Sequence, residues 1–152
     1  MAALDRLAGA VRFAAGVMLV VVAVAMVATI CGRYVGFPTA WADETARCAF
    51  LWSACFGAAA GLHRGAHFAV NLIGTGLTGS SRRALDTTLA AIMIALCVLV
   101  LWATTHSIPV AGNARLPALG ISAAWFHAAI AAFCVLAVVF VSGRIVLIWC
   151  QP

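Results

Sequence analysis

The sequence predicts an all-α integral membrane protein that crosses the bilayer four times. Of its 152 residues, 66% are hydrophobic and 9% are charged, a composition far more apolar than that of soluble domains. The mean hydropathy of +1.14 supports the same class. Because one membrane-spanning helix takes roughly 20 apolar residues, residues 1–152 are predicted to form a single membrane domain with no room for a soluble one.

The predicted transmembrane helices follow the apolar runs of the chain. They cover about residues 11–35, 41–62, 84–107 and 122–149. The first is expected to be a retained helix rather than a signal peptide, because its uncharged run is too long and no Ala-x-Ala cleavage site follows it. Gly36 and Pro38 predict the turn before the second helix, and Thr39 is the expected N-cap.

Two longer connectors separate the later helices. The segment after His63 is too short to span the membrane, so a short interfacial helix is expected between the second and third spans. Residues 106–120 contain Pro109, Gly112 and Pro117, which predicts an irregular connector before the fourth span.

The positive charge of the chain indicates its orientation in the membrane rather than binding of nucleic acid. Nine arginines and no lysine against four acidic residues give a net charge of +5, and the arginines stand at the ends of apolar runs instead of forming a basic stripe. Arg6, Arg12, Arg64, Arg82, Arg83 and Arg144 fall on one side of the predicted topology, and Arg33, Arg47 and Arg115 on the other. This asymmetry predicts that both termini lie in the cytoplasm.

Charged residues at the two ends of the second helix form the first candidate site. Asp43, Glu44 and Arg47 lie at its start, where one arginine can reach both carboxylates across one turn. Ionisable groups at this depth are costly toward lipid, so they are expected to pair or to face protein. A salt-bridge cluster that only anchors the helix is the alternative. Arg64 and His67 are expected to act similarly at the other end.

Further candidates lie along the same helix. Trp41 and Trp52 suit either the membrane interface or helix packing. Gly57 and Gly61 form a Gly-x-x-x-Gly pattern, which permits close approach of another helix.

Little in the sequence predicts chemistry. The six cysteines lie in apolar runs without Cys-x-x-Cys spacing, so neither a metal site nor a disulfide is expected. Nucleophile motifs and phosphate-binding loops are absent, which argues against an enzyme and against a resident cofactor. His106 and His127 are the one histidine pair at matching depth, so a haem-binding membrane anchor of an oxidoreductase remains the alternative. A small multidrug exporter would need an acidic residue inside a span.

Several motifs occur in an order that resembles a known family. They are Arg33-Tyr34-Val35, Trp41-x-x-Glu44-x-x-Arg47, Trp52, Gly57-Ala58-Ala59, His63-Arg64-Gly65-Ala66-His67-Phe68-x-Val70-Asn71 and Ala118-Leu119-Gly120-Ile121-Ser122-Ala123-Ala124-Trp125. Together they resemble the small membrane subunit of tripartite ATP-independent periplasmic (TRAP) transporters, the DctQ-like family. Asn71 stands where that family often has aspartate, and Ser122 where proline is frequent.

The resemblance implies a transport function carried out by partners. In this family a large membrane subunit (DctM-like) holds the substrate and coupling-ion sites, and the small subunit packs against its scaffold part. A periplasmic binding protein (DctP-like) delivers an organic acid, and an ion gradient drives symport. The candidate residues, Arg33 included, are therefore expected to have a structural role or to contact the large subunit, and none is expected to bind substrate. Membrane lipids are the other expected partner of the chain, which the resemblance places in the bacterial inner membrane.

Overall fold

The computed structural model describes residues 2–63 and 80–150, and these residues form four helices. They are α1 (Ala2–Val35), α2 (Ala40–His63), α4 (Ser80–Gly112) and α5 (Ala124–Cys150). Within the described ranges the β-structure is limited to one isolated antiparallel bridge, Arg115 to Ser122. The predicted all-helical fold is confirmed, while the expected interfacial helix lies outside the described residues.

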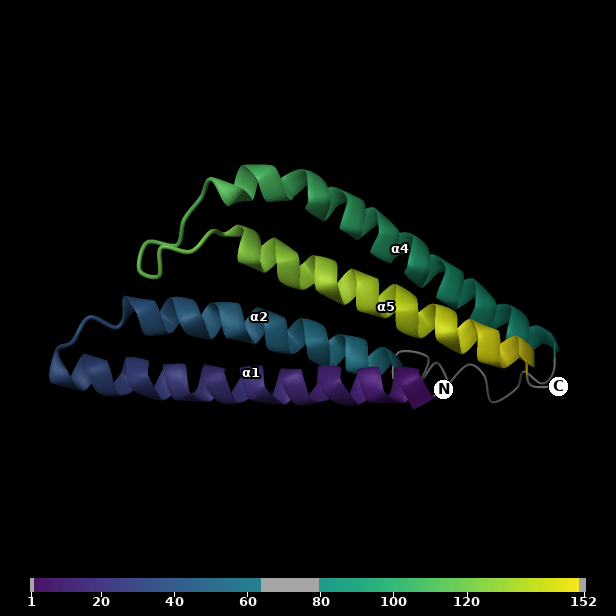
Figure 1. Ribbon diagram of the computed structural model, residues 1–152, viewed down its shortest axis with the longest axis horizontal. Helices are drawn as coiled ribbons and strands as arrows, with labels where there is room; N and C mark the ends of the chain where they lie inside the picture. Colours follow the sequence, from purple (N-terminus) through teal and green to yellow (C-terminus); the bar gives the residue numbers. More distant parts are fainter. Residues whose placement is uncertain (1, 64–79, 151–152) are drawn as a thin grey trace.

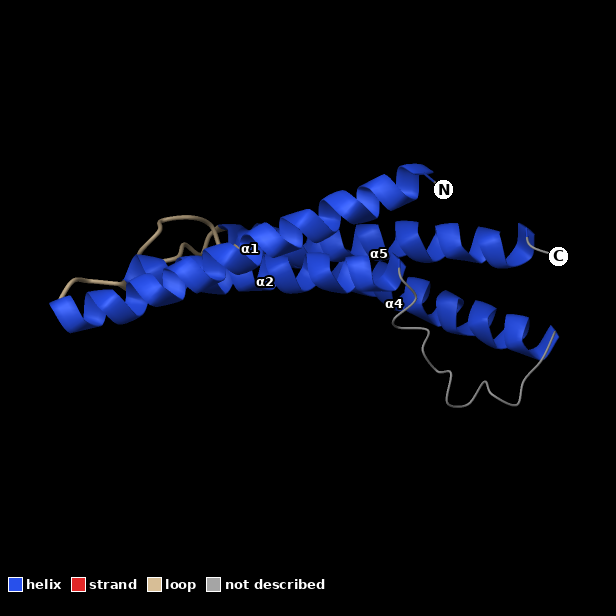
Figure 2. Ribbon diagram, turned by 90° about the horizontal axis from the view of Figure 1, so that it is seen from below, coloured by secondary structure: helices blue, strands red, loops and turns tan. Residues whose placement is uncertain are grey.

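The helices lie side by side in the order α1, α2, α5, α4 (Figure 1). Helix α2 packs against α1 and α5. The main packing partner of α4 is α5. The α1–α2 turn and the α4–α5 loop lie at one end, and the chain starts and α5 ends at the other. Seen from below in Figure 2, the layer twists, so that α1 and α4 diverge at the end where the chain starts. Such a layer leaves faces of its inner helices uncovered.

Three of the four helices have the length and composition of membrane spans. These candidates are Leu4–Val35, Ala84–Gly112 and Ala124–Gly143. Helix α2 is outside this group, and it carries three charged residues in its first two turns. A helix of 24 residues is nevertheless about 36 Å long, enough to cross a hydrocarbon core of roughly 30 Å. A multi-pass membrane protein is therefore supported, and a fourth span through α2 stays a prediction.

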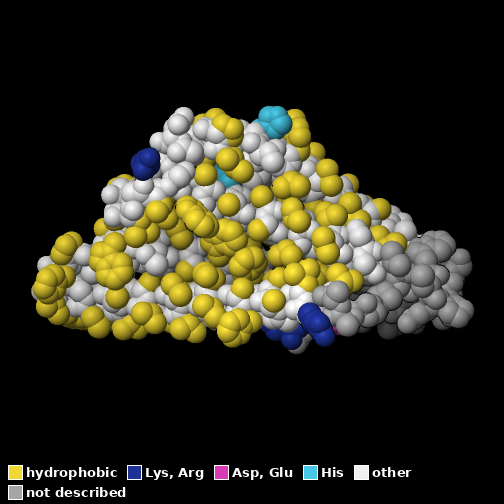
Figure 3. Space-filling model, in the orientation of Figure 1, with side chains coloured by type: hydrophobic (Ala, Val, Ile, Leu, Met, Phe, Trp, Pro, Cys, Tyr) yellow, Lys and Arg dark blue, Asp and Glu magenta, His cyan; other side chains and the backbone are white. Residues whose placement is uncertain are grey.

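Large hydrophobic side chains cover much of the outer surface. Phe13 is 76% exposed, Trp102 64% and Val110 77%, and hydrophobic side chains spread over most of the face in Figure 3. Exposed apolar surface on this scale is unfavourable in water. The helices therefore need lipid or protein around them.

Small side chains form most of the contacts between the helices. Ala8, Ala59 and Ala60 are buried around Phe140, where α1, α2 and α5 meet. A second buried cluster joins Cys97 of α4 to Cys134 and Ala137 of α5 and Leu62 of α2. Alanine lets helix backbones approach closely, and close packing is the main source of helix association in lipid. The thiols of Cys97 and Cys134 are free and buried within this second cluster.

The turn between α1 and α2 ends one helix and starts the next within four residues. Gly36 has a φ of 78°, and the Phe37 N–H donates to the Gly32 carbonyl at 2.9 Å; both are features of a Schellman C-cap. The Thr39 carbonyl then accepts the N–H groups of Ala42 and Asp43. Thr39 thus occupies the predicted N-cap position of α2.

Helix α4 is longer than the sequence predicted. The sequence assigned residues 106–112 to an irregular connector, but α4 passes through Pro109 and ends at Gly112. Proline removes one backbone donor, which leaves the carbonyl of Thr105 without its usual helical partner. Helix α4 is curved in Figure 1, so the proline is accommodated by bending rather than by ending the helix.

Gly36→Ala tests the turn. Because a side chain at positive φ is strained, the variant should lower the free energy of unfolding by about 1 kcal/mol. The effect is measured by thermal unfolding in detergent, with unfolding monitored as dye labelling of the buried thiols of Cys97 and Cys134. Gly112→Ala is the matched control, because that glycine ends α4 without a positive φ and has open space around it. Equal stability of the two variants would contradict the assignment.

Candidate partner-binding site

A short hairpin, residues 114–123, connects α4 to α5 and is held by α2. Within it, the N–H of Leu116 donates to the carbonyl of Ile121 at 2.8 Å, and Gly120 turns the chain with a φ of 66°. The tip of the hairpin is hydrogen-bonded to the Glu44 carboxylate. The carboxylate accepts the N–H of Ala118 at 3.1 Å on both oxygens and the N–H of Leu119 at 2.9 Å on Oε2. Glu44 therefore links the two helical hairpins at this end of the molecule.

The charged cluster at the start of α2 is divided differently from the sequence prediction. Arg47 Nη2 bonds Asp43 Oδ2 at 2.7 Å, and both side chains are largely exposed. Glu44, expected to share that arginine, instead bonds the hairpin. Adjacent residues on a helix point about 100° apart, so one carboxylate faces α5 while the other faces outward with the arginine. The expectation of one three-residue cluster was wrong.

Asp43 and Arg47 begin a continuous stripe on α2, which we call the open face. It contains Asp43, Arg47, Phe50, Ala54, Gly57 and Gly61, at alternating spacings of four and three residues. These spacings place all six on one side of the helix. Phe50 is 61% exposed, and no side chain or neighbouring helix lies within 4 Å of where a Cβ on Gly57 or Gly61 would be. Among the described residues, no other helix therefore fills the space beside the predicted glycine pair.

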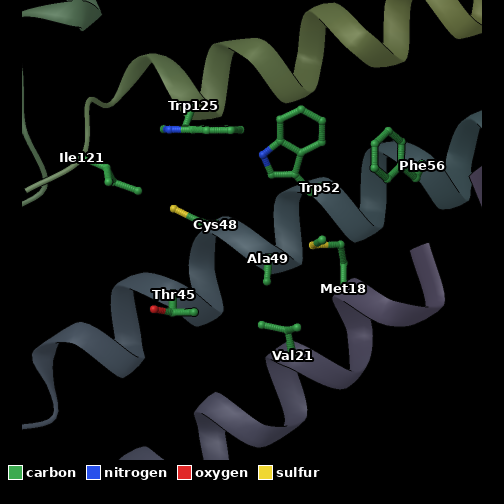
Figure 4. Close-up of a pocket in the computed structure, with 9 residues that line it drawn as sticks. All are labelled: Met18, Val21, Thr45, Cys48, Ala49, Trp52, Phe56, Ile121 and Trp125. Carbon is green, nitrogen blue, oxygen red and sulfur yellow. The ribbon is translucent and has the colours of Figure 1, made fainter. Parts of the chain in front are cut away.

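The opposite side of α2 forms an apolar groove of about 420 Å³. Figure 4 shows Thr45, Cys48, Ala49, Trp52 and Phe56 of α2 lining it, with Met18 and Val21 from α1 and with Ile121 and Trp125 from the α5 side.

Trp52 spans the groove and is a packing residue. Its ring meets that of Trp125 edge-on, with centroids 5.8 Å apart, and lies 5.2 Å from that of Phe56. Next to it, the Ser53 hydroxyl donates to the Ala15 carbonyl of α1 at 3.1 Å. Of the two roles open to Trp52, packing between α2 and α5 is the one its contacts support.

The other end of α2 carries a contact that the sequence did not reveal. His63 Nε2 lies 2.9 Å from Asp5 Oδ1 at the start of α1, and its ring lies 5.3 Å from that of Phe140 on α5. Asp5 and His63 are 58 residues apart, so no local spacing pairs them. Arg64 and His67, the residues predicted for this end, lie outside the described ranges.

The remaining predicted residues lie near the hairpin end of the molecule. Arg33 and Trp41 are exposed on either side of the α1–α2 turn. His106 Nδ1 lies 3.0 Å from the Trp102 carbonyl of its own helix. Nδ1 of His127 is buried and has no hydrogen-bond partner. Among the described residues no group of three or more potential metal ligands occurs.

The fold and these contacts define a multi-pass α-helical membrane protein whose polar contacts hold helices together. The chain belongs to the DctQ component family of the tripartite ATP-independent periplasmic transporters, whose sequence model matches residues 22–151. The resemblance seen in the sequence is thus confirmed, and membership implies the small permease subunit of such a transporter. The comparison with curated proteins gives no match.

Glu44→Ala tests the hydrogen bonds between the Glu44 carboxylate and the hairpin. Loss of the charged acceptor should leave the Ala118 and Leu119 amides open to solvent and speed their hydrogen exchange by roughly tenfold, about the value of one charge-assisted bond at a solvated site. Exchange of peptides covering residues 114–123, read by mass spectrometry, measures it.

Asp43→Asn is the control for Glu44→Ala. It removes only the exposed pair with Arg47, which should contribute little to stability. If this variant loosens the hairpin as much as Glu44→Ala does, or if neither does, the carboxylate does not hold the loop.

Proposed function

We propose that this chain is a scaffold subunit that seats the large membrane subunit of a TRAP transporter in the bacterial inner membrane. All four helices cross the bilayer, with both termini in the cytoplasm. The large DctM-like subunit carries an organic acid delivered by a periplasmic DctP-like protein, driven by an ion gradient. The family membership and the open face of α2 carry this proposal.

The open face of α2 suits a protein neighbour better than lipid. Its half toward the end of α2 contains Ala54, Gly57 and Gly61, which let another helix approach closely. At the start of α2 the open face carries the Asp43–Arg47 ion pair. Acyl chains solvate this pair poorly, but polar groups of a partner can form hydrogen bonds with it. Charge and small residues on one face therefore favour a partner helix there.

The distribution of ionisable groups favours a scaffold over a solute path. Among the described residues, the acidic ones are Asp5, Asp43, Glu44 and Asp86, and each lies within the first two turns of a helix. A path for an organic anion needs polar or cationic groups near the bilayer centre. Each arginine of the described helices also lies in the first or last third of its helix. Charged groups are therefore absent from the middles of these helices, and the large subunit is the better place for substrate.

The two ends of the molecule suit different sides of the membrane. Arg6 and Arg12 stand at the start of α1, and the chain ends at the same side (Figure 1). Arginine is retained on the cytoplasmic side. The hairpin and Glu44 would then face the periplasm, where the binding protein arrives.

Gly57→Leu and Gly61→Leu test the open face. Bulky side chains there should separate the two subunits, because overpacking a close helix contact costs about 1–3 kcal/mol. We expect at least a tenfold loss of the large subunit co-purified with the tagged chain, and a matching loss of uptake in cells that carry the complete transporter.

Ala23→Leu is the control for this experiment, because Ala23 is an exposed small residue on α1, away from the open face. It should leave co-purification unchanged. If the glycine variants retain the large subunit as well as this control does, the partner does not bind the open face.

A further inference from the structure

The start of α1 combines two arginines that form no ion pair with the described residues and an apolar hollow. We propose that it binds one anionic phospholipid, with the phosphate at Arg6 and Arg12 and an acyl chain in the hollow beside Phe13 and Gly16. The inference requires only that α1 spans the membrane. It concerns a different helix from the proposed partner face.

The two arginines are available to a ligand. Both are exposed, and neither makes a hydrogen bond or ion pair with the part of the chain that the structure describes. The nearest acid in sequence, Asp5, is engaged by His63. Gly9 lies between the arginines, and beyond its own stretch of helix no atom of the described residues lies within 4 Å of where its Cβ would be. An anionic group can therefore approach the helix backbone between two guanidinium groups.

The hollow lies directly beyond the arginines along the helix. It measures about 480 Å³ and is lined by Phe13, Gly16, Val17, Val20 and Val21. Gly16 leaves its floor open, since nothing lies within 4 Å of a Cβ there. Figure 3 shows Arg side chains gathered at this end of α1, beside hydrophobic ones.

Helical geometry places Arg6 and Arg12 about 120° apart around α1, with Gly9, Phe13 and Gly16 in the sector between them. Arg6 and Phe13 are seven residues apart and Arg12 and Gly16 four apart, so each arginine precedes a hollow residue on nearly the same side. Gly9 and Phe13 are separated by about 6 Å along the axis. A phosphate near Gly9 would thus direct its acyl chain toward Phe13.

The depth in the membrane also fits a phospholipid. The uncharged run over residues 13–32 is about 30 Å long, which matches the hydrocarbon core. Phe13 then lies at the edge of that core, and Arg12 and Arg6 lie at the level of the headgroups. A partner helix could cover the hollow, but it would need its own acidic groups in the headgroup region, whereas an anionic phospholipid presents both parts at the required depth.

Native mass spectrometry of the purified full-length chain tests the proposal. The chain is mixed with dioleoyl phosphatidylglycerol or with dioleoyl phosphatidylcholine, which share acyl chains and differ in net charge. We expect the anionic lipid to bind roughly thirtyfold more tightly, from two arginines acting on one phosphate. Arg6→Gln with Arg12→Gln should reduce that ratio to about twofold, whereas Arg6→Lys with Arg12→Lys should retain it.

Two further variants separate headgroup from tail. Arg115→Gln removes an exposed arginine at the opposite end and should leave the lipid ratio unchanged. Gly16→Leu fills the hollow and should weaken phosphatidylglycerol binding about tenfold, and inorganic phosphate should not compete.

Three results would overturn the proposal. One is equal binding of the two lipids by the unaltered chain, and another is an equal loss of preference in Arg115→Gln. The third is a Gly16→Leu variant that binds the lipid normally but loses the large subunit on co-purification, which would assign the hollow to the partner. Because the glycine variants on α2 test partner binding separately, failure of one proposal leaves the other standing.

Discussion

The contact between α2 and α5 is the one on which the arrangement of this protein depends. It joins the α1–α2 hairpin to the α4–α5 hairpin along the whole length of α2. At one end Glu44 accepts backbone N–H groups of the connecting loop; in the middle Trp52 meets Trp125; at the other end His63 lies against Phe140. In lipid, where apolar burial gives little drive, such specific contacts determine which helices pair.

The same contact shows how far the sequence could be interpreted. Apolar runs and turn residues predicted the helices and the turn at Gly36, because length, hydropathy and left-handed backbone geometry are local properties. Glu44 was correctly singled out as engaged but given the wrong partner, since its partners, Ala118 and Leu119, are backbone groups some 74 residues away. Pairings such as Asp5 with His63 depend on which helices become neighbours. Composition cannot show this.

The arrangement in a single layer explains why the chain suits an assembly. Inner helices of a compact bundle are covered on all sides, but α2 has its open face, with Phe50 among charged and small residues, on one side and an apolar groove on the other. Its contacts with α1 and α5 cover only the two remaining sides. A helix with three charged residues near its start and two uncovered faces is poorly suited to lipid alone. Other molecules therefore have to cover the two uncovered faces of α2.

Charge pairing distinguishes the two uncovered regions of the layer. Arg47 on α2 is neutralised by Asp43 within its own helix, so a neighbour there can add hydrogen bonds but gains little from carrying net charge. Arg6 and Arg12 on α1 form no ion pair among the described residues, so a neighbour that brings a negative charge is favoured. A close-packing protein helix fits the first region, and an anionic headgroup fits the second. Partner and lipid can then bind different helices without competing.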